Sequence, residues 1–233
     1  MASYVAEGPF AGLEQRLRDR VTSTLVRRTY DKGNHLFSAG EDFAGLFWLR
    51  SGVTLSYNKH NGKRYEFAAP VYWGMWGAPA MLTRVHRSAL QARSRCIVDW
   101  LPAREARTLA DEPDFMKLVA KWTADDYARL LELLAVISIN RSDERLLGYL
   151  RQVYTLARAN PGDNARMQSD SGIAWPFTTV ELAAFLALSR PHVSTILGRL
   201  NSEGRIRIDN RMLFIPEADE EPGAQDLRTG ELR

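Results

Sequence analysis

The stretch that most constrains the fold of this chain is residues 177–216, because it carries the start signals of two short helices separated by a tight turn. Thr178 and Glu181 have the spacing of a capping box, in which each side chain bonds the backbone N–H of the other residue at the start of a helix. Ser189 is a suitable N-cap for a second helix. Pro191 fits the first turn of that helix, where a backbone N–H would have no intrahelical acceptor. The segment therefore predicts a helix-turn-helix.

The second helix of this pair, residues 190–203, has one apolar and one polar face. Its apolar residues recur at i, i+3, i+4 and i+7, as in a buried stripe, and they are Val193, Ile196, Leu197 and Leu200. A polar loop is expected over 160–175, before the first helix. After the glycine that ends the second helix, the strings 206–208 and 212–215 predict a two-stranded wing. A winged helix-turn-helix with a polar helix face is a device for reading the major groove of DNA.

The residues that we expect at the DNA lie on and beside this polar face. They are Thr178, Ser189, Arg190, Pro191, His192, Ser194, Thr195, Arg199 and Arg211. Arginine can bond a guanine edge or a phosphate, and threonine can bond a base edge or contact a thymine methyl. Residues 176–216 contain five basic and three acidic residues, which is a modest excess for a surface that binds phosphates. The alternative is a packing module with the same elements and no nucleic acid.

Composition excludes several classes of protein. Of the 233 residues, 45% are apolar and 25% are charged, as in a globular protein long enough for two domains. A single cysteine, Cys96, excludes an internal disulfide and a cysteine-ligated metal cluster. We expect a cytoplasmic protein without membrane contact, because the sequence shows neither a signal peptide nor a membrane-spanning apolar run. The net charge of +3 suits an anionic partner.

Residues 25–101 have the pattern of a compact β-domain. Val53, Leu55 and Tyr57 alternate with polar residues, which is typical of a strand with one buried face. Asn61-Gly62 predicts a hairpin after that strand, since both residues tolerate positive φ. Recurrent glycines mark further turns between short strands. The region therefore predicts a β-barrel or β-roll.

From Asp114 the apolar residues recur with the period of a helix, and neither glycine nor proline interrupts this pattern up to about Asn140. Two apolar rows with 4-3-4-3 spacing lie side by side, the first beginning at Val119 and the second at Ala120. A helix of ~27 residues is about 40 Å long, which is more than one small barrel covers. We therefore expect a homodimer through this helix. Its predicted interface residues are Val119, Thr123, Tyr127, Leu130, Leu134 and Ile137. The alternative is a helix buried within its own subunit.

These patterns predict an α+β fold in four parts. An effector-binding β-roll (a jelly-roll-like domain) covers 1–112, and a dimerisation helix covers 113–140. A winged helix-turn-helix domain covers 141–216 and begins with an amphipathic helix over 142–159. Residues 217–233 hold six acidic residues and two arginines, and we expect a disordered acidic tail there.

Several short strings in this order resemble the Crp/Fnr family of bacterial transcription regulators, over about residues 25–216. They are Ala39-Gly40-Glu41, Ser51-Gly52-Val53, Asn61-Gly62-Lys63, Glu112-Pro113-Asp114, Thr178-x-x-Glu181-Leu182 and Ser189-Arg190-x-x-Val193-x-x-Ile196-Leu197. The resemblance implies a β-roll related to cyclic-nucleotide-binding domains, a dimerisation helix and a winged DNA-binding domain. It also implies a homodimer that binds double-stranded DNA at a two-fold symmetric site in response to a small effector, with RNA polymerase as a further partner.

The resemblance further implies an effector pocket, formed by Trp73, Gly74, Met75, Trp76, Arg87, Ser88, Leu130 and Leu131. Arg87-Ser88 resembles the phosphate-binding pair of family members that bind cyclic nucleotides. However, Met75 stands where a glutamate binds the ribose, and two leucines stand where hydroxyl groups meet the adenine. Each unsatisfied ligand hydroxyl costs about 1–3 kcal/mol, so we expect no tight binding of cyclic AMP. The effector stays unidentified, and an alternative is that the aromatic residues only fill the roll.

The second helix also departs from the best-known family pattern. Pro191 occupies the place of a glutamate, Thr195 the place of an arginine, and Ala187 the place of the turn glycine. We therefore expect an operator that differs from the best-known half-sites of the family.

The sequence is best interpreted as a sequence-specific transcription regulator with no catalytic residues and no metal site. No nucleophile elbow, phosphate-binding glycine loop or metal-ligand spacing indicates an enzyme. The alternative is a ligand-binding module whose winged domain serves protein contacts. That alternative predicts no salt-dependent affinity for DNA.

Overall fold

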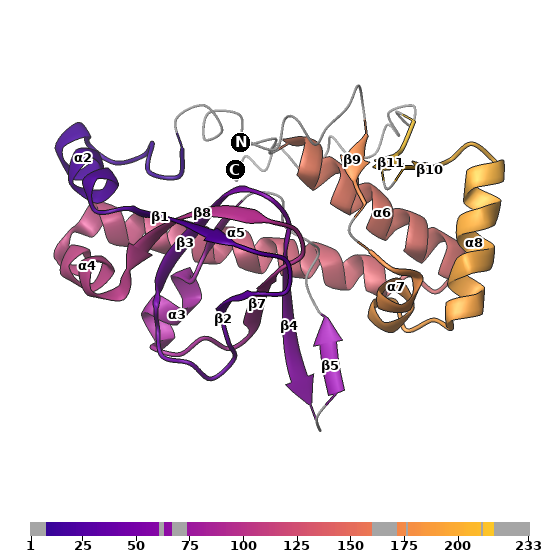
Figure 1. Cartoon of the computed structure of the whole chain (residues 1–233), viewed down its shortest axis with the longest axis horizontal. Helices are drawn as coiled ribbons and strands as arrows, with labels where there is room; N and C mark the ends of the chain where they lie inside the picture. Colours follow the sequence, from indigo (N-terminus) through magenta and orange to yellow (C-terminus); the bar gives the residue numbers. More distant parts are fainter. Residues whose placement is uncertain are drawn as a thin grey trace, which may run out of the picture.

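The computed structural model of the protein describes residues 8–60, 63–66, 74–159, 172–175, 177–210 and 212–216. A domain of two β-sheets and a smaller, mainly helical domain lie side by side along the longest axis of the molecule (Figure 1). One long helix runs behind the sheet domain toward the smaller domain. The α+β class expected from the sequence is confirmed. Among the helices described, none is long and apolar enough to cross a membrane. The expected acidic tail over 217–233 lies outside the described residues.

The larger domain consists of two antiparallel four-stranded sheets. The first has the order β1 (Val26–Tyr30), β8 (Cys96–Pro102), β3 (Gly45–Ser51), β6 (Gly74–Trp76). The second has the order β2 (His35–Phe37), β7 (Ala89–Ala92), β4 (Thr54–His60), β5 (Lys63–Glu66). The backbone pairs His60 with Lys63, which confirms the predicted hairpin, although its two turn residues lie outside the described ranges.

The sheets bury an apolar layer between them. Leu49 of β3 and Val98 of β8 stand opposite each other in the antiparallel register, and both are fully buried. They belong to one cluster with Leu90 of β7, on the other sheet. Because side chains alternate along a strand, the intervening residues of β3 and β8 point to the other face of the first sheet. Leu46 and Leu101 lie there, and both are buried against helices.

Three short helices and one 3-10 turn lie around the sheets in the residues that the structure describes. The helices are α2 (Gln15–Ser23), α3 (Ala78–Thr83) and α4 (Ala103–Thr108), and the 3-10 turn covers Leu109–Asp111. α3 interrupts the region 25–101, for which the sequence pattern predicted only strands. Its six residues are too few for an apolar period to be recognised.

The long helix α5 (Pro113–Ile137) connects the two domains, and the proline occupies its first turn. The N-terminal half of α5 covers the outer face of the first sheet. Phe115, Val119 and Trp122 are buried there in one cluster with Leu46 and Met75. This packing uses one side of the helix, and the opposite side is exposed in the described part of the chain.

The exposed apolar side of α5 is the second row of the sequence pattern, one residue further along than the first, together with Leu130 of the first row. Val119 is fully buried inside its own subunit, so its predicted place at the dimer contact is wrong. Thr123 is half-buried and donates its hydroxyl to the Val119 carbonyl (2.9 Å). Ile137 is half-buried against the core of the small domain. The exposed row, called the α5 stripe below, consists of Ala120, Ala124, Tyr127, Leu131 and Leu134.

In its described residues, the small domain combines three helices with a three-stranded sheet. The helices are α6 (Ser142–Ala159), α7 (Thr179–Phe185) and α8 (Arg190–Ser202). The strand order is β10 (Arg207–Asp209), β11 (Met212–Phe214), β9 (Ile173–Ala174). The predicted wing is therefore present as β10 and β11, but β9 was predicted as loop. Two residues are too few for an alternating pattern, and Ile173 is held by its pairing with Leu213.

Candidate nucleic-acid interface

The first helix of the pair, α7, begins with the predicted capping box. The Glu181 backbone N–H donates to Thr178 Oγ1 (3.2 Å), and the Thr178 backbone N–H donates to Glu181 Oε2 (2.7 Å). Leu182 and Ala183 then turn inward and are buried in the core of the domain. The cap and the buried side fix α7 in place, while Thr178 stays exposed.

The turn between α7 and α8 is tight and forms without a glycine. Ala187 has a φ of 52°, in the left-handed region that a Cβ disfavours. The turn is closed by a hydrogen bond from the Leu188 N–H to the Ala183 carbonyl (2.9 Å) and by the buried side chain of Leu186. Tertiary packing therefore holds a backbone conformation that this residue does not favour by itself.

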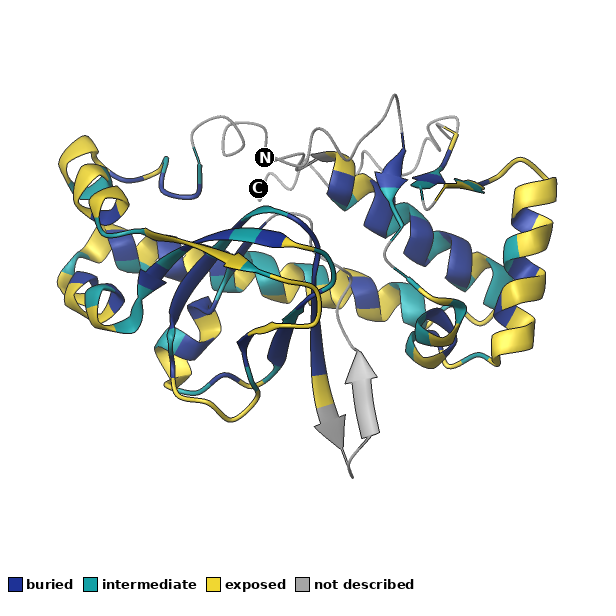
Figure 2. Cartoon of the chain, viewed as in Figure 1, coloured by how far each residue is buried: buried dark blue, intermediate teal, exposed yellow. Residues whose placement is uncertain are grey.

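The second helix, α8, begins at the predicted cap and buries the predicted stripe. Ser189 Oγ accepts from the His192 N–H (3.3 Å), and proline occupies the first turn. Val193, Ile196 and Leu200 are buried, whereas the opposite side of the helix faces outward at the end of the molecule (Figure 2). The polar side of α8 is consequently accessible along its whole length.

The centre of this outward side of α8 carries no charge. Pro191, Ser194 and Thr195 are exposed, and the space beyond Gly198 is open. The Thr195 hydroxyl donates to the Pro191 carbonyl (3.0 Å), so its oxygen keeps acceptor capacity for an outside donor. Arg190 is exposed and forms no ion pair within the described part of the chain. Small polar residues thus form the middle of the face, and a free guanidinium stands at its N-terminal end.

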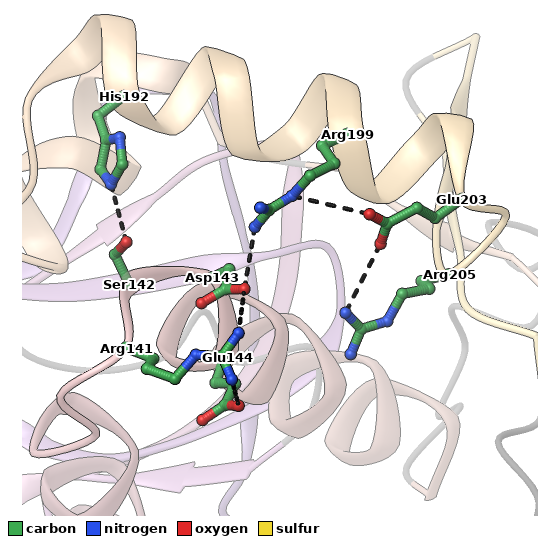
Figure 3. Close-up of polar contacts among 8 residues, drawn as sticks. All are labelled: Arg141, Ser142, Asp143, Glu144, His192, Arg199, Glu203 and Arg205. Atoms are coloured by element: carbon green, nitrogen blue, oxygen red, sulfur yellow. Dashed lines mark hydrogen bonds and ion pairs between the residues drawn. The ribbon is translucent and has the colours of Figure 1, made fainter.

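One edge of α8 is tied to the start of α6 (Figure 3). A hydrogen bond joins His192 Nε2 and Ser142 Oγ (2.8 Å). Arg199 donates to Asp143 Oδ2 (2.9 Å) and lies 3.8 Å from Glu203. Arg199 can therefore bind a phosphate only as a shared or exchanged partner of Asp143. The sequence patterns treated the first residues of α6 only as helix caps and gave no sign of this contact.

The carboxylate of Asp143 is held in its ionised form. Burial of the carboxylate by itself raises the pKa of Asp143. The backbone N–H groups of Glu144 and Asp143 and the Arg141 guanidinium outweigh this effect, so the pKa of Asp143 is lowered. Arg141 itself lies 3.2 Å from Asp143 and 3.0 Å from Glu144. The start of α6 is thus a small network of opposite charges beside the C-terminal half of α8.

The wing carries an arginine that packs on an aromatic ring. Arg207 of β10 lies over the ring of Phe214 on β11, with its guanidinium carbon 4.1 Å from the ring centre. Asn210 turns the chain between the two strands with a φ of 47°. Arg211, which the sequence assigned to the DNA contact, lies outside the described residues.

The residues assigned to an effector pocket do not lie on one surface. Met75 is buried against α5, on the opposite face of β6 from Trp76, which packs toward the layer between the sheets. Met75 is therefore a core residue, and its place in the pocket is corrected. Ser88 accepts a hydrogen bond from Ser56 (3.1 Å), whereas Arg87 is exposed. Trp73 lies outside the described residues.

The remaining pocket residues lie on other elements. Gly74 begins β6, and Leu130 and Leu131 are 40% and 47% exposed on α5. Within the described part of the chain, no group of three or more histidine, cysteine, aspartate or glutamate side chains is placed to hold a metal ion.

Comparison with known proteins places this arrangement among bacterial regulators. Residues 144–220 match the family described as a Crp-like helix-turn-helix domain. The fumarate nitrate reduction regulatory protein of Klebsiella oxytoca is 23% identical over 216 residues, which cover 91% of this chain and 83% of that protein. The anaerobic regulatory protein of Pasteurella multocida is 23% identical over 210 residues, 89% of this chain and 74% of that protein.

A solved structure supports the same fold. FixK2 from Bradyrhizobium japonicum superposes with a TM-score of 0.68 at 17% identity, covering 82% of this chain and 92% of FixK2. The order of sheet domain, long helix and winged domain is therefore shared between the two chains.

Proposed function

We propose that this chain, which belongs to the Crp/Fnr family of DNA-binding transcription regulators and is not an enzyme, acts as a homodimer that reads a two-fold symmetric operator through α8. The observation that carries the proposal is the outward side of α8. It is accessible, uncharged at its centre and bordered by Arg190 and Arg199. A recognition helix of this kind brings small side chains close to the base edges while its arginines reach a guanine or the phosphates.

The dimer is part of the proposal, and the α5 stripe supports it. Tyr127 is 62% exposed and Leu134 50% exposed, on a helix whose other side is buried in its own subunit. A second copy packed along this stripe would remove the apolar surface from water. Two copies of α8 related by a two-fold axis would then meet half-sites about 10 base pairs apart, centre to centre.

The operator is proposed to differ from the best-known half-sites of the family. Pro191 cannot accept a hydrogen bond from cytosine through its ring, and Thr195 cannot reach a guanine as an arginine does. Direct reading of bases would thus depend on Arg190, Ser194 and Thr195, with apolar contact from the Pro191 ring.

The proposed effector differs from cyclic AMP. Met75 belongs to the core beneath α5, and Leu130 and Leu131 offer no hydrogen bonds. The proposal also includes RNA polymerase as a partner, because a regulator changes transcription only through that enzyme. We infer a cytoplasmic location from the DNA that the protein binds.

The test is a selection of binding sites from random duplex DNA with the purified full chain and no added ligand. Enrichment of a two-fold symmetric sequence with half-sites one helical turn apart would support the proposal. Enrichment of a sequence that contains one site without a symmetry-related second half-site would contradict the dimer. A chain that binds no duplex at low salt, with or without an extract of small metabolites, would favour the alternative in which the winged domain contacts proteins.

A further inference from the structure

A polar contact connects the sheet domain directly to the capping box of α7. Arg93, which follows β7, forms an ion pair with Glu181 Oε1, and the two residues are 88 positions apart in the chain. Both side chains are largely buried, at 17% and 18% exposed. An ion pair between side chains that are this little exposed is weakly screened by salt. Removal of one partner leaves the charge of the other without compensation.

The two partners are each held firmly by their own domain. The Arg93 N–H donates to the Val53 carbonyl (2.7 Å), and the Val53 N–H donates to Ser94 Oγ (2.9 Å). Glu181 uses its second oxygen, Oε2, for the Thr178 N–H (2.7 Å) and hydroxyl (2.9 Å). The backbone of Arg93 and the carboxylate of Glu181 are therefore each held in place by their own domain.

Apolar and backbone packing accompany the ion pair. Val53 of the sheet domain is 2% exposed and belongs to the same buried cluster as Leu182 of α7 and Leu133 of α5. Strand β5 also runs beside α7, as Figure 1 shows. The first helix of the DNA-binding pair thus packs against the sheet domain of its own subunit, although the two domains are joined in sequence through α5.

We propose that Arg93 and Glu181 form an interdomain lock that holds the winged domain in the described orientation relative to the sheet domain. A reorientation of the winged domain that moves Glu181 away from Arg93 breaks this pair, because the two residues belong to different domains. An event in the sheet domain that moves Arg93 would thereby change the DNA affinity of α8, without contact with DNA. This inference rests on the proposed function, since its readout includes DNA binding.

The experiment is a double-mutant cycle on the full chain. The variants are Arg93→Ala, Glu181→Gln and the double variant, and glutamine at the third helical position keeps the capping hydrogen bond while it removes the charge. Binding is measured by fluorescence anisotropy with the duplex recovered from the selection. We expect each single variant to change Kd at least fivefold in the same direction, and the double variant to change it no more than the larger single change. The control is Arg50→Ala, because Arg50 pairs with Asp99 inside the sheet domain (3.4 Å), and we expect it to bind like the wild type.

The direction of the change identifies the state that the lock stabilises. Weaker binding by both single variants assigns the described orientation to the DNA-competent state, and tighter binding assigns it to the resting state. Unchanged Kd values, or changes that add up in the double variant, would overturn the lock. If the wild type bound no duplex, the proposed function would fail instead.

A second readout tests the lock without DNA. Backbone hydrogen exchange in β5 and in the first turn of α7 should be at least tenfold faster in Arg93→Ala than in the wild type, while exchange in the first sheet stays the same. Equal exchange in both proteins would overturn the inference even if the proposed function holds.

Discussion

At the scale of single residues, the outward face of α8 shows how little charge the recognition helix carries at its centre. Within the described part of the chain, Arg190 is exposed there and forms no ion pair, whereas Arg199 is engaged by Asp143 and Glu203. A free guanidinium can bind a base edge without first giving up an ion pair. An engaged one has to exchange partners, so the two arginines are not equivalent for DNA binding.

Arg190→Ala should therefore weaken binding to the selected duplex by about 1–3 kcal/mol and relax the preference at one base pair of each half-site. Arg104→Ala, which removes an exposed arginine from α4 in the sheet domain, is the control and should leave binding unchanged. Anisotropy titrations on the duplex and on its single-base variants measure both effects. A loss of affinity that is the same on every sequence would instead make Arg190 a phosphate contact.

Ala187 is the second residue with a specific energetic consequence. Its φ of 52° places an exposed methyl group in the left-handed region, at a cost of about 1–2 kcal/mol. Ala187→Gly should raise the free energy of unfolding by about 0.5–1 kcal/mol, because the relief of strain exceeds the added entropy of the unfolded chain. Urea denaturation checks this value.

The matched control for Ala187→Gly is Ala184→Gly. Ala184 is also exposed but lies inside α7, where the same exchange should lower stability by up to about 1 kcal/mol. Opposite signs for the two variants would support the left-handed turn. A loss of stability at both positions would argue against it.

At the scale of elements, α5 has two apolar sides with different tasks. One side, through Phe115, Val119 and Trp122, is part of the core beneath the first sheet. The other is the α5 stripe, which no element in the described part of the chain covers. An apolar row of this length on a well-anchored helix is a surface suited to a second copy.

Leu131→Asp should convert the proposed dimer into a monomer, because two carboxylates would be buried against apolar side chains of the α5 stripe. Leu131 is 47% exposed in the single chain, so the variant should keep its fold and its circular dichroism spectrum. Glu132→Ala, at the next and exposed position of the same helix, should remain dimeric. Sedimentation velocity at micromolar concentration separates these results. A monomeric wild type, or a dimeric Leu131→Asp, would contradict the α5 interface.

At the scale of the whole molecule, charge is unevenly distributed along the chain. Residues 1–216 carry a net charge of +7, and residues 217–233 carry −4. The acidic segment directly follows the winged domain in sequence, so its charge lowers the attraction between that domain and DNA at low salt.

Truncation after Pro216 should therefore tighten DNA binding several-fold at ~50 mM salt and have little effect at ~0.5 M salt, where charges are screened within a few ångströms. Anisotropy titrations at four salt concentrations measure the difference between the two proteins. Equal affinity at low salt would show that the charge of residues 217–233 does not act on the bound DNA.

Features that depend on neighbouring residues could be predicted from the sequence, whereas contacts between distant segments could not. The sequence by itself determined the caps of α7 and α8, the buried stripe of α8 and the extent of α5, because these features depend on hydrogen bonds and periods within a few residues. It also determined the α+β class and the order of β-domain, long helix and winged helix-turn-helix, although it missed the short elements α2, α3 and β9.

Only the tertiary structure decided which row of α5 is exposed, because burial depends on a sheet that is formed elsewhere in the chain. The same holds for Arg199, whose partner Asp143 is 56 positions away, and for the contact of Arg93 with Glu181 across the two domains. It holds too for β9, which is a strand through its pairing with β11. A contact between two distant segments produces no repeating pattern in the sequence of either segment. It therefore becomes visible only in the packed tertiary structure.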